Sequence, residues 1–223
     1  MKKNEKISES LLLGSVLAAA GGFTDSYSYL VRGGVFANAE TGNIVLMGMN
    51  LATGNYIHAL HYLTPIIAFT LGILISECFR KNLGEKDGVH WKEAVLWLEV
   101  VTLSVAAFIP QAENSLVNSM IAFVCAMQVQ AFRKLRGNVY ATTMCTGNLR
   151  SGAELLFSKD YEGNKEKHKE GFLYLWIDAA FAGGAAMGAY MCRFFEEKAI
   201  LICAFVLLCC AIAIKYKKKS FAI

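Results

Sequence analysis

Charged residues are scarce in this chain. Only 18% of its 223 residues are charged, whereas 55% are hydrophobic. A soluble domain of this length could bury a core, but it would rarely need so apolar a composition. The composition therefore argues against an all-soluble protein, which would have to bury six apolar helices in one domain.

Motifs for catalysis and metal binding are also lacking. The seven cysteines show no C-x-x-C and no paired spacing, so neither a metal site nor a disulfide framework is indicated. The sequence has no G-x-S-x-G or H-E-x-x-H, and no histidine lies at the centre of an apolar segment. His58 and His61 are three residues apart, but no third ligand is near them. We therefore expect no enzymatic activity, no metal and no cofactor.

What the chain does contain is a set of apolar segments. Six of them are nearly free of charge and have about the length that crosses a lipid bilayer. They cover residues 11–31, 57–79, 95–109, 116–129, 172–192 and 199–214. The third, fourth and sixth are short, so we expect their helices to extend into the flanking polar residues.

Basic residues are distributed unevenly between these segments. All 22 lysines and arginines except Arg32, Arg193 and Lys198 lie at the two chain ends, between the second and third segments, or between the fourth and fifth. Positive charge stays on the cytoplasmic side during insertion, so we expect both termini in the cytoplasm. The net charge of +4 then marks topology and predicts no nucleic-acid partner. A signal peptide cleaved near Ala20 is the alternative, but it would leave an odd number of segments.

The tripeptide Thr-Gly-Asn occurs twice, at residues 41–43 and 146–148. The repeat extends upstream, because LVRGGVFANAETGN (30–43) aligns with KLRGNVYATTMCTGN (134–148) with one residue inserted before the second TGN. The aligned pairs are Arg32 with Arg136, Gly33 with Gly137, Val35 with Val139, and Phe36 with Tyr140. Asn138 replaces Gly34, and we expect it to adopt a left-handed backbone conformation, which Asn tolerates.

A second aligned block predicts the architecture. FTLGILIS (69–76) matches FAGGAAMG (181–188), so that Phe69 pairs with Phe181 and Gly72 with Gly184. Each copy has one apolar segment, a TGN segment and two further apolar segments. Because three is odd, the second copy must enter the membrane from the opposite side, as in transporters and channels with inverted repeats.

We therefore predict an all-α integral membrane fold of six transmembrane helices. Two inverted three-helix repeats, at about 8–112 and 114–215, form a single membrane domain over residues 1–223. Each repeat has a short TGN-containing segment after its first helix.

The same residues resemble a known family. GGFTDSYSYL…GGVFANAETGN, followed by AMQVQAFRKLRG…TTMCTGNL, resembles the YoaK-like bacterial inner-membrane proteins, a family of unknown function. The resemblance runs from about residue 12 to 214, and its specific marks are the early GFTD and the two TGN segments. It implies six spans and a bacterial plasma (inner) membrane, but no substrate or reaction.

The TGN segments are candidate binding elements. We expect Thr41 and Thr146 to cap short helices, with Gly42 and Gly147 allowing close approach to the backbone. Free N–H groups at such helix starts favour an anionic group. Two structural turns are the alternative, but Asn43 and Asn148 form a matched pair of amides with no obvious capping need. The apolar NIVLMGMNLA should be buried, and the more polar second copy, with Arg150 and Glu154, should lie near the cytoplasmic interface.

Three acids lie inside apolar segments: Asp25, Glu99 and Asp178. A carboxylate in hydrocarbon must be protonated or paired, so each is a candidate functional residue, with a bond to a neighbouring helix as the alternative. Asp25 ranks first, because hydroxyl side chains surround it, and we expect it to carry protons. Asp178 ranks next, on a segment whose glycine spacing suits close helix packing. Glu99 is expected near a membrane interface.

Gln128 and Gln130 end the fourth segment, roughly where Asp25 lies on the first. Replacing an acid with amides would turn a symmetric site into one with a single proton carrier. This hypothesis predicts that Asp25→Asn abolishes proton-coupled flux and that Gln130→Ala leaves coupling intact.

A proton-coupled transporter of a small solute, for instance an anionic metabolite, is the function we favour. A non-transporting scaffold or accessory subunit and an intramembrane enzyme are the alternatives. The expected partners are the solute, protons and the lipid bilayer. The glycine-rich face of the fifth segment suits either internal packing or a homodimer.

Overall fold

The computed structural model describes residues 9–83, 90–135, 138–157 and 165–219, and each apolar segment forms most of one long helix. The six long helices are α1 (Leu11–Val31), α3 (Tyr56–Leu83), α4 (His90–Ala106), α5 (Asn114–Ala131), α7 (Lys165–Phe195) and α8 (Ile200–Lys219). As expected for the short segments, α4, α5 and α8 extend into flanking polar residues. However, α4 ends at Ala106, before the predicted residue 109.

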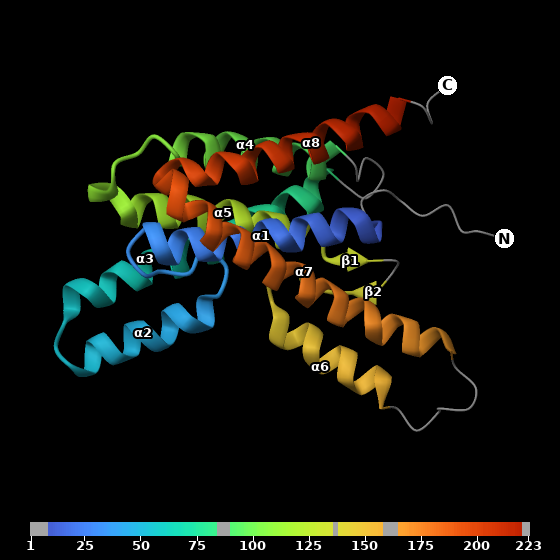
Figure 1. The fold of residues 1–223 in the computed structure, drawn as a ribbon, viewed down its shortest axis with the longest axis horizontal. Coiled ribbons are helices and arrows are strands. Elements are labelled where there is room, and N and C mark those ends of the chain that lie inside the picture. Colours follow the sequence, from blue (N-terminus) through green and yellow to red (C-terminus); the bar gives the residue numbers. More distant parts are fainter. Residues whose placement is uncertain (1–8, 84–89, 136–137, 158–164, 220–223) are drawn as a thin grey trace.

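One short helix follows the first long helix of each half. These two short helices are α2 (Glu40–Ala52) and α6 (Cys145–Leu156), which carry the two TGN sequences. Both begin near the middle of the molecule and run toward opposite ends of it (Figure 1). The start of α1 and the end of α8 lie together at one end (Figure 1). Two short 3₁₀ turns, η3 (Gln111–Glu113) and η4 (Glu196–Ala199), directly precede α5 and α8.

The segment before α6 differs from the sequence prediction. Strands β1 (Lys134–Leu135) and β2 (Asn138–Val139) form a small antiparallel pair in which Leu135 lies opposite Asn138. Asn138 therefore has an extended backbone, and the expected left-handed conformation is wrong. Gly33 and Gly34 do have positive φ angles of 88° and 76°. Arg136 and Gly137, to which the alignment pairs Arg32 and Gly33, lie outside the described residues.

Helix packing follows a regular plan. Helix α1 packs against α7, and α3 packs against α5. The short helices lie on the third helix of their own halves, α2 on α3 and α6 on α7. Helix α4 packs on α8 and α5, while α8 also packs on α1. If α1–α4 are exchanged with α5–α8, the set of pairs is unchanged: α4 with α8 maps onto itself, and every other pair becomes another pair of the set.

Two matched glycines permit the closest helix contacts. A Cβ atom on Gly184 of α7 would lie 1.9 Å from the carbonyl oxygen of Ala19 in α1. A Cβ atom on Gly72 of α3 would lie 2.4 Å from the carbonyl oxygen of Phe123 in α5. The glycines that the sequence repeat pairs thus allow equivalent backbone approaches in the two halves.

A buried arginine explains the early end of α4. The Arg32 side chain is 0% exposed and its guanidinium donates to the carbonyl oxygens of Ala106 at 2.7 Å and Ile109 at 2.9 Å. It also donates to the Tyr27 hydroxyl at 2.8 Å. The last carbonyls of a helix have no partner inside the helix, and here a side chain that follows α1 in the same half supplies one.

The outer surface is strongly apolar. Every long helix presents large hydrophobic side chains outward, including Leu12, Ile57, Val101, Leu116, Trp176 and Phe205. Among the described residues, the stretches Tyr56–Asn82 and Lys167–Tyr216 have the length and apolar composition to cross a membrane. Helix α2 buries only Asn43, so the prediction that NIVLMGMNLA packs inside the protein is wrong. Its apolar side chains instead extend the apolar outer surface.

Candidate functional site

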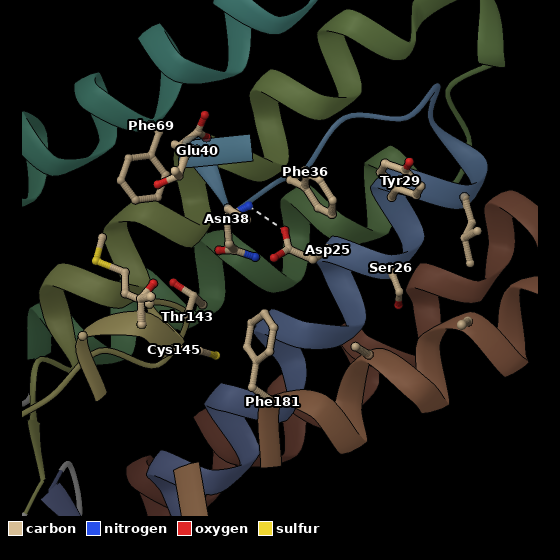
Figure 2. A pocket seen from close by; sticks show the side chains of 18 residues that line it. Asp25, Ser26, Tyr29, Phe36, Asn38, Glu40, Phe69, Thr143, Cys145 and Phe181 are labelled. Atoms are coloured by element: carbon tan, nitrogen blue, oxygen red, sulfur yellow. Dashed lines mark hydrogen bonds between the residues drawn. The ribbon is translucent and has the colours of Figure 1, made fainter. Parts of the chain in front are cut away.

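The two TGN segments meet at one cavity of about 870 Å³. Its walls come from residues before and at the start of α2 and α6, from α1 beyond Asp25, from α7, and from Phe69 of α3. Figure 2 shows Asp25 and Asn38 beside each other in this cavity, with Glu40, Thr143, Cys145 and Phe181 around them. Segments about a hundred residues apart in the sequence therefore build a single site.

Asp25 holds the chain that leads into α2. Its side chain is 5% exposed, and its Oδ1 accepts a hydrogen bond of 2.7 Å from the backbone N–H of Asn38. The Asn38 amide in turn donates to the Thr24 hydroxyl at 2.9 Å and to the Gly21 carbonyl at 3.2 Å. The nearby hydroxyl groups do not donate to the Asp25 carboxylate, which corrects the expectation of hydroxyl partners. Thr24, Ser26 and Ser28 instead donate to backbone carbonyls of α1.

The two TGN asparagines make the same hydrogen bonds. Asn43 accepts from the Phe36 N–H at 3.0 Å and donates to the Phe36 carbonyl at 2.7 Å. Asn148 accepts from the Ala141 N–H at 3.2 Å and donates to the Ala141 carbonyl at 2.7 Å. Each amide thus pairs with the backbone seven residues earlier, as a neighbouring β-strand would. Both asparagines are buried, so they shape the segments and do not line the cavity.

These bonds also correct the repeat alignment. Phe36 and Ala141 occupy equivalent positions relative to the asparagines, so Phe36 is not equivalent to Tyr140 as the sequence alignment has it. The inserted residue falls before this position. Glu40 then corresponds to Cys145, and Asn38 to Thr143. All four of these residues line the cavity.

The remaining amide hydrogen of each asparagine has a different acceptor in each half. Asn43 donates to Glu40 Oε2 at 2.9 Å, within its own helix. Asn148 donates to Asp178 Oδ1 at 2.9 Å, on α7. Asp178 is half-buried and does not line the cavity, so the structure links it to the second TGN segment and separates it from Asp25.

The threonines do not cap the helices, which corrects the prediction for Thr41 and Thr146. Helix α2 has Ala39 at its N-cap and α6 has Met144, and neither start has a side-chain cap bond. Each threonine lies one residue inside its helix and lines the cavity. The chain turns into each helix through the asparagine bonds, so a capping hydroxyl is not required.

The two glycines have different surroundings. A Cβ atom on Gly42 would lie 2.9 Å from the Phe36 ring, so this glycine permits packing against an aromatic wall of the cavity. Gly147 lines the cavity itself and has no atom within 4 Å of its Cβ position. The start of α6 is therefore at the cavity, and only its later residues, with the ion pair of Arg150 and Glu154 at 2.9 Å, extend away from it.

Glu99 is buried, which contradicts the expectation of a position near an interface. Its side chain is 1% exposed inside the bundle. The Gln128 amide, oriented as its neighbours require, donates to the two Glu99 oxygens at 3.0 and 3.2 Å. The pair joins α4 to α5, and neither residue lines the cavity. The Gln128 amide thus binds the Glu99 carboxyl group, and Gln128 does not take the place of Asp25 in the second half.

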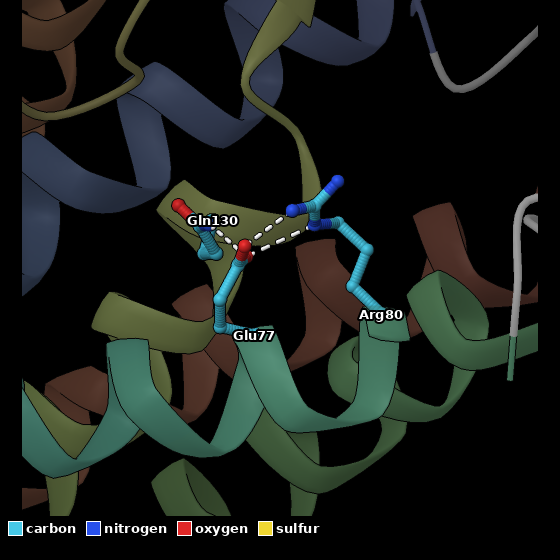
Figure 3. Close-up of polar contacts among 3 residues, drawn as sticks. All are labelled: Glu77, Arg80 and Gln130. Carbon is cyan, nitrogen blue, oxygen red and sulfur yellow. Dashed lines mark hydrogen bonds and ion pairs between the residues drawn. The ribbon is translucent and has the colours of Figure 1, made fainter. Parts of the chain in front are cut away.

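Gln130 also lies away from the cavity. It donates to Glu77 Oε2 at 2.6 Å, which links the ends of α5 and α3. Arg80 binds the same carboxylate from the next turn of α3. Figure 3 shows the Glu77 carboxylate between Gln130 and Arg80. This cluster was not expected from the sequence.

The structure adds cavity residues that sequence reasoning missed. The new polar members are Asn38, Glu40, Thr143 and Cys145, and the aromatic members are Tyr29, Phe36, Phe69 and Phe181. One signal could have identified part of this set, because the repeat pairs Phe69 with Phe181 and both rings line the cavity. Glu40 directly precedes the first TGN, but it is the folded chain that brings it near Asp25.

Comparison with known proteins supports the resemblance of the GFTD and TGN segments to the YoaK-like proteins. A family described as protein of unknown function (DUF1275) matches residues 13–213. The UPF0700 transmembrane protein YoaK of Bacillus subtilis (strain 168) is 29% identical over 147 residues, which cover 61% of this chain and 63% of that protein. This chain thus matches less than two thirds of that relative's length. No solved structure matches it. Because the family match covers most of the sequence, the chain belongs to the DUF1275 family, of which YoaK-like proteins are relatives.

Proposed function

We propose that this protein is a six-span transporter of a small solute in the bacterial plasma membrane, with both termini in the cytoplasm. The observation that carries the proposal is the meeting of both TGN segments at one cavity. Two short helices that run to opposite ends of the molecule begin there (Figure 1). In membrane proteins, interrupted helices of this kind are found where they are buried in protein or line a solute pathway.

The apolar outer surface supports the membrane location. Large hydrophobic side chains on all six long helices would be unfavourable in water, whereas lipid would cover them. The Bacillus subtilis relative is itself named a transmembrane protein. The helix ends beside the basic loops lie at one end of the molecule, which agrees with a cytoplasmic side chosen by positive charge (Figure 1).

The packing plan supports an inverted repeat. The contacts of α1–α4 with α5–α8 are unchanged as a set when the two halves are exchanged. The matched contacts of Gly72 and Gly184, and of Asn43 and Asn148, agree with the same exchange. Two nearly equivalent halves can exchange conformations, which would open the shared cavity to each side in turn.

Two aligned pairs of residues differ between the halves in a way that suggests the access route. The repeat alignment pairs Ser26 with Gln130 and Ala189 with Glu77. Ser26 and Ala189 line the cavity, on the parts of α1 and α7 that lead to the external side. Gln130 and Glu77 are bonded to each other across α5 and α3. We therefore infer that the cavity is open toward the outside in this structure and that the Gln130–Glu77 pair closes the cytoplasmic route.

Asp25 is the proposed proton carrier. It is the buried carboxylate that both lines the cavity and holds the chain entering α2. A change in its protonation would therefore alter the solute site and the start of α2 together. We propose binding and transport without covalent chemistry.

Flux measurements on purified protein in liposomes test this function. Membrane currents on a solid support are recorded while small organic anions, sugars and amines are applied in turn, and proton movement is followed with a pH-sensitive dye. We expect one solute class to evoke transport that Asp25→Asn abolishes, whereas Gln130→Ala keeps proton coupling and changes the rate. Absence of both current and dye response for every solute, with folded protein, would contradict the proposal and favour a scaffold.

A further inference from the structure

The ionisable residues of the cavity are all acidic or weakly acidic. Asp25 and Glu40 contribute carboxyl groups, Tyr29 a phenol and Cys145 a thiol. Among the described residues that line the cavity there is no lysine, arginine or histidine. A solute with a negative charge would therefore approach two carboxyl groups without a basic side chain to bind it.

The protein's own acids already occupy the expected anion position. The start of α2 would attract an anion through its free N–H groups. However, Asp25 accepts the N–H of Asn38, two residues before α2, and Glu40 is the first residue of that helix. These acids compensate the positive end of α2, so a bound anion would compete with them. The sequence-based preference for an anionic solute is therefore not favoured by this arrangement.

Aromatic rings form much of the remaining wall. Tyr29 and Phe36 stack with ring centroids 4.8 Å apart, and Phe69 and Phe181 face the cavity from α3 and α7. Figure 2 shows these four rings around Asp25 and Glu40. Aromatic faces attract cations and repel anions, because the ring quadrupole is negative on the face.

Three oxygen atoms of residues that line the cavity are buried and have no hydrogen-bond partner among the described residues. They are Asn38 Oδ1, Glu40 Oε1 and Thr143 Oγ1. Asn38 and Thr143 are buried, with exposed fractions of 3% and 5%. Buried polar atoms are nearly always paired, so these unpaired acceptors favour a bound molecule that carries N–H donors over one that carries only acceptors.

We propose that the cavity binds an organic amine in its protonated form, with the ammonium group between Asp25 and Glu40 and its apolar part against the aromatic rings. This inference rests on the proposed transport function and specifies its solute. An ammonium group supplies the positive charge that the side chains of the wall lack, together with N–H donors for its carboxyl groups. Since the same carboxyl groups bind either a proton or an ammonium ion, movement of the amine in one direction is exchanged for movement of a proton in the other.

Three probes of similar shape test the charge preference: 2-phenylethylamine, 2-phenylethanol and phenylacetate. Binding to the purified, detergent-solubilised protein is measured by calorimetry at neutral pH. We expect the amine to bind at least about tenfold more tightly than the alcohol, and phenylacetate to bind most weakly. Equal or tighter binding of the alcohol or of phenylacetate would overturn the proposal, as would failure of folded protein to bind the amine.

Variants locate the binding. Glu40→Gln and Asp25→Asn should each weaken amine binding at least about tenfold, and the effect on the alcohol should be small. Two separate carboxyl variants are used so that one still tests the proposal if the other fails to fold. Glu154→Gln changes an exposed acid on α6 outside the cavity and should leave binding unchanged. Amine binding that survives both cavity variants would overturn the proposal.

Uptake into liposomes separates this inference from the transport proposal. Amine binding without uptake under an imposed pH gradient would support the amine site and contradict transport. Uptake of phenylacetate or of the alcohol, with no amine uptake, would support transport and overturn the amine site.

Discussion

At the scale of single residues, the asparagine of each TGN segment has a role that threonine or glycine could not fill. Its amide donates and accepts at the same time, so it pairs with both polar groups of a backbone residue seven positions earlier. This pairing satisfies the buried backbone of an irregular segment, for which lipid offers no partner. The repeated tripeptide is therefore explained first by its asparagine.

Asn43→Ala and Asn148→Ala should each destabilise the protein by roughly 2–4 kcal/mol, because buried backbone groups lose their partners. Thermal unfolding of the detergent-solubilised protein, followed by tryptophan fluorescence, measures the change. Thr41→Val is the matched control, since Thr41 is exposed at the cavity and caps no helix. Unchanged unfolding of both alanine variants would show that the amides do not hold these segments.

At the scale of helices, close approach between the halves depends on glycine. Helix α7 meets α1 at Gly184, and α3 meets α5 at Gly72, with backbone atoms where a side chain would otherwise lie. Without a hydrophobic driving force in lipid, such close packing is a main source of helix association. The same contacts keep α1 and α7, which together line the cavity, at a fixed distance.

Gly184→Ala and Gly72→Ala should therefore separate these helices and lower stability by roughly 1–3 kcal/mol or more. Gly183→Ala provides a control on the same helix as Gly184, because its Cβ position has no atom within 4 Å. Apparent melting temperature in detergent is the measurement. The expected order is a large decrease for Gly184→Ala and Gly72→Ala and little change for Gly183→Ala. A decrease of equal size in the control would mean that helix contacts are not the cause.

At the scale of the whole molecule, the two short helices distinguish an inverted repeat from a parallel one. Helices α2 and α6 begin at the shared cavity and end at opposite ends of the molecule (Figure 1). If the basic loops are cytoplasmic, α2 ends outside the cell and α6 ends inside. This difference is testable without knowledge of the solute.

Single cysteines placed just after each short helix, Thr53→Cys and Phe157→Cys, report this arrangement. Both positions are exposed, and the seven native cysteines are first replaced by alanine or serine. A membrane-impermeant maleimide added to intact cells should label Thr53→Cys and leave Phe157→Cys unlabelled until the membrane is opened. The cysteine-free background provides the control for non-specific labelling. Labelling of both positions from outside would contradict the inverted topology.

Local sequence was sufficient to predict the helices and part of the site. A long run of apolar residues forms a helix wherever backbone groups cannot bond to water, so the six segments could be located without knowing their neighbours. Asp25 was identifiable because a carboxyl group within such a run is costly unless it has a function or a partner. The repeat also predicted matched roles for Gly72 and Gly184.

Contacts between distant segments could only come from the tertiary structure. Arg32 ends α4 early because the folded chain places its guanidinium on the carbonyls of Ala106 and Ile109. Glu99 is buried because Gln128 on α5 pairs with it. Glu40 and the aromatic rings join Asp25 only where the two halves meet. The sequence by itself thus determined where the helices form and identified Asp25, but not Glu40, as a candidate acid. The choice of partners for polar side chains was decided by tertiary packing, because hydrogen bonds act over about 3 Å and depend on which segments come together.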